Sequence, residues 1–239
     1  MIRIANAAGF WGDSVTAPLR TVRATALDVL TLEYLAELTM SILARQREKD
    51  PAAGYATDFL RVLTSLAEEL ARQPQLHIVT NAGGMNPAAC AAAAARILCQ
   101  AGLEATPVAV VDGDDLLPHL DRILAATPLA HLDTCQPLGE LRQRVVAANA
   151  YLGAVPIAEA LTQQARVVIT GRVADASLTL GPAVARFGWK WDDYDHLAAA
   201  TVAGHLIECG AQSTGGFYTH WQEIDLAEVG YPVAELQAD

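Results

Sequence analysis

Short apolar runs alternate with helix-like segments along most of the chain. Runs of about four to eight apolar or β-branched residues bounded by turn residues predict buried strands, here at residues 1–8, 27–32, 77–80, 106–111 and 165–170. Another alternating run predicts a strand at residues 217–224. Segments with apolar residues at helical spacing follow most of these runs. We therefore expect an α/β fold with a mostly parallel sheet flanked by helices, in a Rossmann-like three-layer architecture.

The clearest single unit covers residues 77–103. The run HIVT predicts a strand, NAGGMNP a loop, and the alanine-rich stretch that follows a helix. Asn86 suits an N-cap, Pro87 a first helical position, and Gly102 a left-handed residue after the last turn. In a parallel sheet such a loop leaves the carboxyl end of its strand, which is the edge where ligands bind.

Length and composition bound the possible functions. With 239 residues, about half of them hydrophobic, the chain can form one domain over 1–239, with a subdomain or insertion around 127–150. The formal charge of −11 disfavours nucleic acid and anionic membranes as partners, because their phosphates would be repelled. We find no signal peptide and no apolar stretch of about 18 residues, and no CxxC spacing among the four cysteines. We expect a cytoplasmic protein with reduced thiols.

Polar residues after the predicted strands are the candidate site residues. We expect catalytic roles for Glu37, Arg172 and Glu208. Substrate-binding roles are predicted for Asp13, Asn81, Gly83, Gly84, Asn86, Asp114, Asp175 and Thr214.

Each of these residues also has a purely structural interpretation. The glycines of the NAGGMNP loop suit either ligand-binding N–H groups or a tight turn. Glu33 and Glu37 suit either a site at the carboxyl end of a strand or the solvated start of a helix. The acids of residues 112–115 suit a hydroxylated ligand or a divalent cation, or else a helix cap. Arg172 follows a buried run, where its fork suits a carboxylate or phosphate, or an ion pair with Asp175 or the acids of 112–115.

His205 and Cys209 lie four residues apart in a predicted helix, residues 196–209, and therefore share a face. That face could carry two metal ligands, but no third ligand is spaced beside them, which favours a packed helix face. We predict no metal ligands and no cofactor, with a divalent cation at the acids of 112–115 as the alternative. The signatures GxGxxG, GxxxxGK[ST], HExxH and GxSxG are absent, which removes most support for nucleotide, zinc-protease and serine-hydrolase functions.

Several long motifs, in order, resemble the N-terminal domain of the acyclic terpene utilisation (AtuA) family. They are GFWGD (9–13), YLAELTM (34–40), GYATDF (54–59), TNAGGMNP (80–87), ITGRVADASLTLGP (169–182) and GHLIECGAQSTGG (204–216). The resemblance implies a place in the breakdown of acyclic terpenes through acyl-CoA intermediates. Family members are typically longer, which implies a short or split form here. Glu33 stands where the family pattern leads us to expect aspartate, and Ala174 and Ala176 reduce the polar content of the arginine loop.

Residues and resemblance together give a leading hypothesis and a rival. The first is an enzyme of acyclic terpene or branched acyl-CoA catabolism that acts on a small carboxylate or acyl-CoA thioester by lyase or hydratase chemistry. In it Arg172 holds the anionic group, N–H groups of the 81–86 loop stabilise an oxyanion, and Glu37 or Glu208 moves the proton. The rival is a noncatalytic ligand-binding or scaffolding subunit completed by a second chain. We expect a homo-oligomer or a complex with a second subunit.

Overall fold

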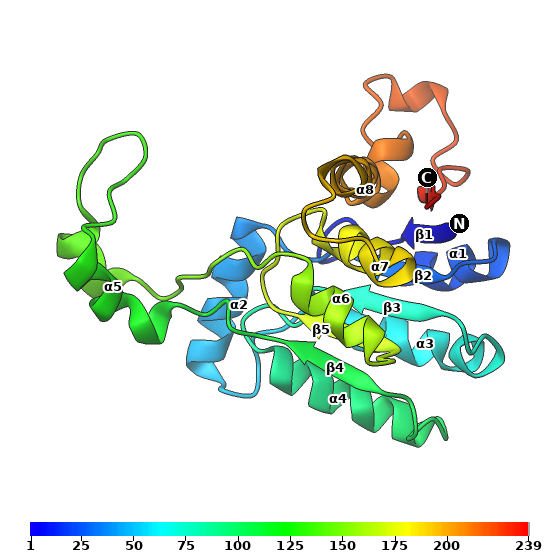
Figure 1. Ribbon diagram of the computed structural model, residues 1–239, viewed down its shortest axis with the longest axis horizontal. Coiled ribbons are helices and arrows are strands. Elements are labelled where there is room, and N and C mark those ends of the chain that lie inside the picture. The colour runs from blue at the N-terminus through cyan, green and yellow to red at the C-terminus, as the bar shows by residue number, and fades with distance from the viewer. Residues whose placement is uncertain (239) are drawn as a thin grey trace.

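The computed structural model describes residues 1–238 and places six strands in one sheet (Figure 1). The strands are β1 (Ile2–Asn6), β2 (Val29–Leu32), β3 (His77–Thr80), β4 (Val108–Val111), β5 (Val167–Thr170) and β6 (Val233–Leu236). Their order across the sheet is β4-β5-β3-β2-β1-β6. All neighbouring pairs are parallel except β1 and β6. The predicted mostly parallel α/β sheet is confirmed.

Helices cover both faces of this sheet. They are α1 (Ala17–Ala24), α2 (Glu37–Lys49), α3 (Asp58–Arg72), α4 (Pro87–Gln100), α5 (Leu120–Ala126), α6 (Val155–Thr162), α7 (Ser177–Phe187) and α8 (Tyr194–Ile207). Residues of α1 to α4 share one buried core with the sheet, and residues of α6, α7 and α8 share the other. The expected three layers are therefore present. None of the helices of residues 1–238 is long and apolar enough to span a bilayer.

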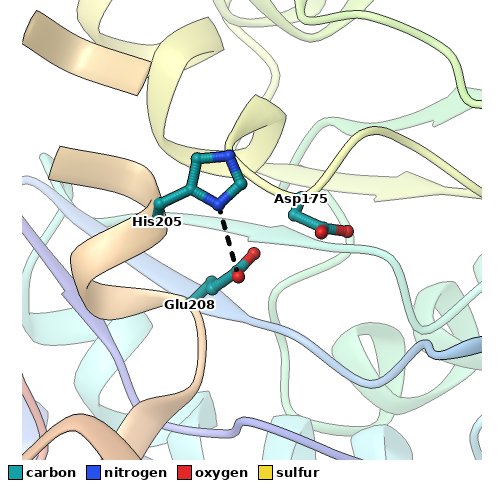
Figure 2. Close-up of side chains that lie close together, drawn as sticks. All are labelled: Asp175, His205 and Glu208. Carbon is teal, nitrogen blue, oxygen red and sulfur yellow. Dashed lines mark hydrogen bonds and ion pairs between the residues drawn. The ribbon is translucent and has the colours of Figure 1, made fainter. Parts of the chain in front are cut away.

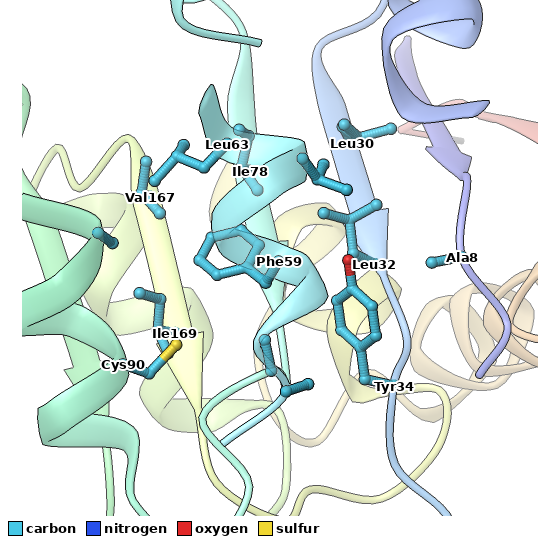
Figure 3. Close-up of a cluster of buried hydrophobic side chains, with 14 of the residues drawn as sticks. Ala8, Leu30, Leu32, Tyr34, Phe59, Leu63, Ile78, Cys90, Val167 and Ile169 are labelled. Carbon is cyan, nitrogen blue, oxygen red and sulfur yellow. The ribbon is translucent and has the colours of Figure 1, made fainter. Parts of the chain in front are cut away.

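The strands are apolar on both sides because both faces are covered. In β5, Val167 and Ile169 pack into the core under α3 and α4, whereas Val168 between them packs into the core under α6 and α7. Phe59 of α3 is fully buried at the centre of the first core (Figure 3). This two-sided burial explains why short continuous apolar runs marked the strands in the sequence.

The unit around β3 forms as the sequence predicts. The Asn86 Oδ1 accepts a hydrogen bond from the Ala89 backbone N–H at 3.3 Å, and Pro87 is the first helical residue of α4. Gly102 follows the helix with a φ of +72°, the left-handed conformation that glycine adopts without strain.

One predicted strand is wrong. Residues 217–224 form turns and a short 3-10 helix (Trp221–Glu223). Phe217 and Trp221 are exposed, so these alternating apolar residues do not form the buried face of a strand. The sheet edge beside β1 is instead occupied by β6, which lies near the N-terminus in Figure 1.

Residues between β4 and α6 extend away from the rest of the molecule (Figure 1). They contain α5, a 3-10 helix (Leu138–Arg144) and a loop between them. Leu132 in that loop is 97% exposed. This segment includes the stretch around 127–150 that we predicted as a subdomain or insertion.

Candidate functional site

The loops at the carboxyl ends of β1, β2 and β5 meet the end of α8 around a small polar hollow. Its volume is about 190 Å³. In an open parallel sheet this edge is where ligands bind. The residues that line it are Gly9, Glu33, Leu35, Ala36, Glu37, Arg172, Asp175, Glu208 and Cys209.

Glu33 follows β2 directly and is the most buried acid of the hollow. Only 7% of the residue is exposed. Its Oε1 accepts a hydrogen bond from the Asn81 side-chain amide, and its Oε2 has no hydrogen-bond partner among the described residues. Burial raises the pKa of Glu33 to about 8, against the opposing effects of the Asn81 amide and the Arg172 charge. The sequence placed Glu33 at the carboxyl end of a strand, but it was not among the predicted site residues.

Asn81 follows β3 and joins the ends of two neighbouring strands. It is fully buried, and its Oδ1 accepts a hydrogen bond from the Tyr34 N–H at 2.8 Å while its amide donates to Glu33. Asn81 is not among the residues that line the hollow. Its effect on a ligand there would pass through Glu33.

Arg172 follows β5, and its side chain is almost completely buried. One Nη donates to the Leu35 carbonyl at 2.9 Å. The other lies 3.4 Å from a carboxylate oxygen of Glu37 and 3.3 Å from one of Asp175. The guanidinium carbon stacks 4.2 Å from the centre of the Tyr151 ring. The intramolecular ion pair with Asp175, one of the two interpretations from the sequence, is therefore present.

Glu37 begins α2 at the outer rim of the hollow. Its side chain is 76% exposed, and it accepts a hydrogen bond from the Tyr151 hydroxyl. That hydrogen bond lowers the pKa of Glu37, with a smaller contribution from the Arg172 charge. A carboxylate stabilised in this way is a weaker proton acceptor than an ordinary glutamate. Tyr151 lies shortly before α6 and was not among the predicted site residues.

Glu208 directly follows α8, is partly buried and lines the hollow. Its carboxylate lies near His205 and Asp175 (Figure 2). Asn6, at the end of β1, fixes this helix end because its side-chain amide donates to the carbonyls of Ile207 and Glu208. Burial raises the pKa of Glu208, and the neighbouring Asp175 raises it further. The His205 Nδ1 lies 3.4 Å from a carboxylate oxygen of Glu208.

Other predicted residues line a second hollow of about 240 Å³ at the ends of β3 and β4. Gly84, Asn86 and Asp114 belong to it, together with Arg47 and Asp115, whose side chains form an ion pair at 3.0 Å. Asp114 is buried and accepts hydrogen bonds from the Arg172 backbone N–H and the Asn149 amide, both at 2.9 Å. Asp114 thus ties the two hollows together through the loop after β5.

The loop that we expected to stabilise an oxyanion uses several of its N–H groups internally. Gly84 and Asn86 donate to carbonyls within the loop, and Met85 donates to the Gly54 carbonyl. Gly83 allows close packing, since a Cβ there would lie 2.5 Å from the Thr170 carbonyl oxygen. These donors fold the loop and do not face the first hollow.

The comparisons with known proteins give one match. Residues 2–239 match the family described as "Acyclic terpene utilisation family protein AtuA". The chain belongs to the AtuA family. The comparisons with curated proteins and with solved structures gave no match.

Motifs that resembled the AtuA family in the sequence supply most polar residues of the first hollow. ITGRVADASLTLGP contains Arg172 and Asp175, GHLIECGAQSTGG contains Glu208 and Cys209, and YLAELTM contains Glu37. These motifs lie far apart in the AtuA-family sequence, and the parallel strand order brings them to one edge of the sheet.

Four predicted residues line neither hollow, namely Asn81 and Gly83, described above, and Asp13 and Thr214. Asp13 accepts hydrogen bonds from the Gly9 N–H at 3.0 Å and the Tyr231 hydroxyl at 2.8 Å, and so fixes the loop after β1. Thr214 donates to the Gly230 carbonyl at 2.5 Å. It lines a shallow depression near Tyr218 that shares no residue with the first hollow.

A wider groove of about 460 Å³ lies at the opposite, amino-terminal edge of the sheet. Ile2, Val29 and His77, at the starts of β1, β2 and β3, line it. Its one acidic residue, Asp28, accepts a hydrogen bond from the Arg3 backbone N–H at 2.8 Å. We place the candidate site in the smaller hollow, because the buried Glu33 and the acids around Arg172 face that one.

Proposed function

We propose that this chain is an enzyme of acyclic terpene or branched acyl-CoA catabolism, acting on a small carboxylate or acyl-CoA thioester by lyase or hydratase chemistry. The family supports a role in the use of acyclic terpenes. The observation that carries an enzymatic role is Glu33, a buried carboxyl group with an unpartnered oxygen that lines a hollow at the carboxyl edge of the sheet. A cytoplasmic location is part of the same proposal.

Hydration and its reversal need a proton to move but no redox partner. Water adds its oxygen to the β-carbon of an enoyl thioester, and a proton goes to the α-carbon. Glu33 suits the proton transfer, because a carboxyl group with a raised pKa is still protonated near neutral pH and can donate. We assign this step to Glu33 in place of Glu37, whose lowered pKa makes it a poor donor.

Arg172 is suited to bind the substrate oxygen. Its contacts with Glu37 and Asp175 are long, at 3.4 and 3.3 Å, and both acids are exposed. A substrate oxygen that enters the hollow can therefore displace one of them from the guanidinium edge. The contact with the Leu35 carbonyl and the Tyr151 ring keeps the guanidinium in place during that exchange.

The test is turnover by the purified chain. Methyl-branched enoyl-CoA and 3-hydroxyacyl-CoA thioesters are incubated with the protein, and gain or loss of water is followed by mass spectrometry. We expect turnover that Glu33→Gln lowers about a hundredfold or more, since general acid catalysis contributes about that much. Glu159→Gln, on the exposed side of α6, should retain full activity. Ligand-induced thermal stabilisation without any turnover would overturn the proposal in favour of a binding subunit.

A further inference from the structure

Asp175, His205 and Glu208 lie close together (Figure 2), and Asp175 and Glu208 line the first hollow. One ligand atom from each lies within 4.8 Å of those of the other two. His205 is in the last turn of α8, Glu208 directly follows that helix, and Asp175 lies in the loop between β5 and α7. Among the described residues, no other group of three such side chains comes this close.

The third member distinguishes this group from two similar pairs in the chain. His196 and Asp193, and His220 and Glu223, are also histidine–acid pairs three residues apart. Among the described residues, only His205 and Glu208 have a further carboxylate beside them, because the loop after β5 brings Asp175 to the end of α8. The sequence spacing paired His205 with Cys209, whereas the structure groups His205 with Glu208 and Asp175.

Glu33 supplies an independent sign that a charged or donating ligand belongs in this hollow. It lines the hollow together with Asp175 and Glu208, is more than nine-tenths buried, and leaves its Oε2 without a hydrogen-bond partner among the described residues. A buried carboxyl oxygen without a partner is costly. A ligand that donates a hydrogen bond to it, such as water on a bound cation, would remove that cost.

The charge around the hollow also favours a cation. Four acids line it, Glu33, Glu37, Asp175 and Glu208, whereas Arg172 is the one basic residue of the lining. The Arg172 guanidinium is already in contact with two of these acids and a backbone carbonyl. An additional positive charge near Asp175 and Glu208 would therefore be attracted, not repelled.

We propose that Asp175, His205 and Glu208 bind one divalent cation of the first transition row. One imidazole and two carboxylates suit Mn²⁺, Fe²⁺ or Zn²⁺, and three protein ligands leave open positions for water or substrate. Ligand atoms on one such ion lie roughly 3–3.5 Å apart. Asp175 and His205 reach this spacing by side-chain rotation, since both are exposed, while Glu208 stays in place at the helix end.

One part of this inference rests on the proposed function, namely that the ion faces the substrate. A cation there would polarise a thioester carbonyl or bind a carboxylate, which gives the acidic hollow a way to hold an anionic ligand. Binding of the cation itself does not depend on that function. The two can therefore fail separately.

The experiment is a titration of chelator-stripped protein, without a polyhistidine tag, with Mn²⁺ followed by electron paramagnetic resonance. We expect one Mn²⁺ per chain, and affinity at least tenfold lower in His205→Ala and in Glu208→Gln, since even outer-sphere partners of a metal are worth that much. Pulsed spectra should show coupling to an imidazole nitrogen that is lost in His205→Ala. His220→Ala removes the histidine of a matched pair outside the hollow and should bind Mn²⁺ as the unaltered chain does.

The absence of saturable Mn²⁺ and Zn²⁺ binding, or equal binding by His205→Ala and the unaltered chain, would overturn the cation site. Circular dichroism checks that each variant is folded. If stripped protein binds no metal but still turns over a thioester, the proposed function stands and the cation site is wrong. If the protein binds metal but turns over no thioester, the cation site stands and the proposed function is wrong.

Discussion

Replacing Glu33 with glutamine should make the stability of the protein depend less on pH. In the folded chain, burial raises the pKa of Glu33 to about 8 from an ordinary value of 4.5. Between pH 4.5 and about pH 8, Glu33 holds a proton in the folded protein that it releases in the unfolded chain. The free energy of unfolding therefore falls as the pH rises through this window, and the stabilising contribution is complete only below 4.5.

The size of the effect follows from the same two values. Between pH 4.5 and about pH 8, each pH unit lowers the free energy of unfolding by up to about 1.4 kcal/mol. The whole interval therefore sets an upper limit of about 5 kcal/mol, and we expect the free energy of unfolding to fall by a few kcal/mol. The Asn81 amide and the Arg172 charge reduce the loss, and Glu208 and Asp175 increase it. Glutamine keeps the acceptor for Asn81 and carries no charge.

Urea unfolding followed by tryptophan fluorescence, from about pH 5 to about pH 9 with EDTA present, measures this difference. Glu33→Gln should match the unaltered chain near pH 5 and exceed it by a few kcal/mol near pH 9. Glu159→Gln, an exposed substitution of the same kind, should follow the unaltered chain throughout. Parallel pH profiles for Glu33→Gln and the unaltered chain would show that Glu33 is ionised in the fold, which would refute the reasoning.

Two further substitutions test the packing of the strand-end loops by urea unfolding. Gly83→Ala places a Cβ 2.5 Å from a backbone carbonyl oxygen and should cost about 1–3 kcal/mol, whereas Gly153→Ala, in open space, should change little. Arg172→Met leaves the buried Leu35 carbonyl without its charged donor and should cost about 1–3 kcal/mol, against almost nothing for the exposed Arg96→Met. Equal stabilities within either pair would contradict the contacts described.

The fold could be predicted from the sequence because its strands are buried on both faces. VLTL, HIVT and VVIT are short continuous runs of apolar or β-branched residues, and each is followed by a turn and a helix. The prediction failed at residues 217–224, where a similar alternation has exposed aromatic side chains and no neighbouring strand. Hydrophobic period alone does not say whether a partner for the strand exists.

The candidate site could be predicted only in part, because the fold of each loop decides which hollow its residues line. Glu37, Arg172, Asp175 and Glu208 were predicted and line one hollow. The loops after β3 and β4 leave the same edge of the sheet, but their predicted residues Gly84, Asn86 and Asp114 line a second hollow. Strand order alone does not separate the two groups, since β5 lies between β4 and β3, and the sequence marks the strand ends without giving the path of each loop.

Glu33 carried a stronger sequence signal than the prediction allowed it, because it was considered beside Glu37 at the end of a strand but left out of the predicted site. It stands in the stretch LTLEYL, directly after a buried strand and directly before the buried residues Tyr34 and Leu35. A single acid inside such a run must either turn to solvent or be buried at a cost, and a buried acid needs a reason to be kept. Asp28, at the other end of β2, lowers this cost by accepting a hydrogen bond from the Arg3 backbone N–H. Among the described residues, Glu33 has only the Asn81 amide as a partner and leaves one oxygen unpaired, and we infer that the reason to keep it lies in the hollow that it lines.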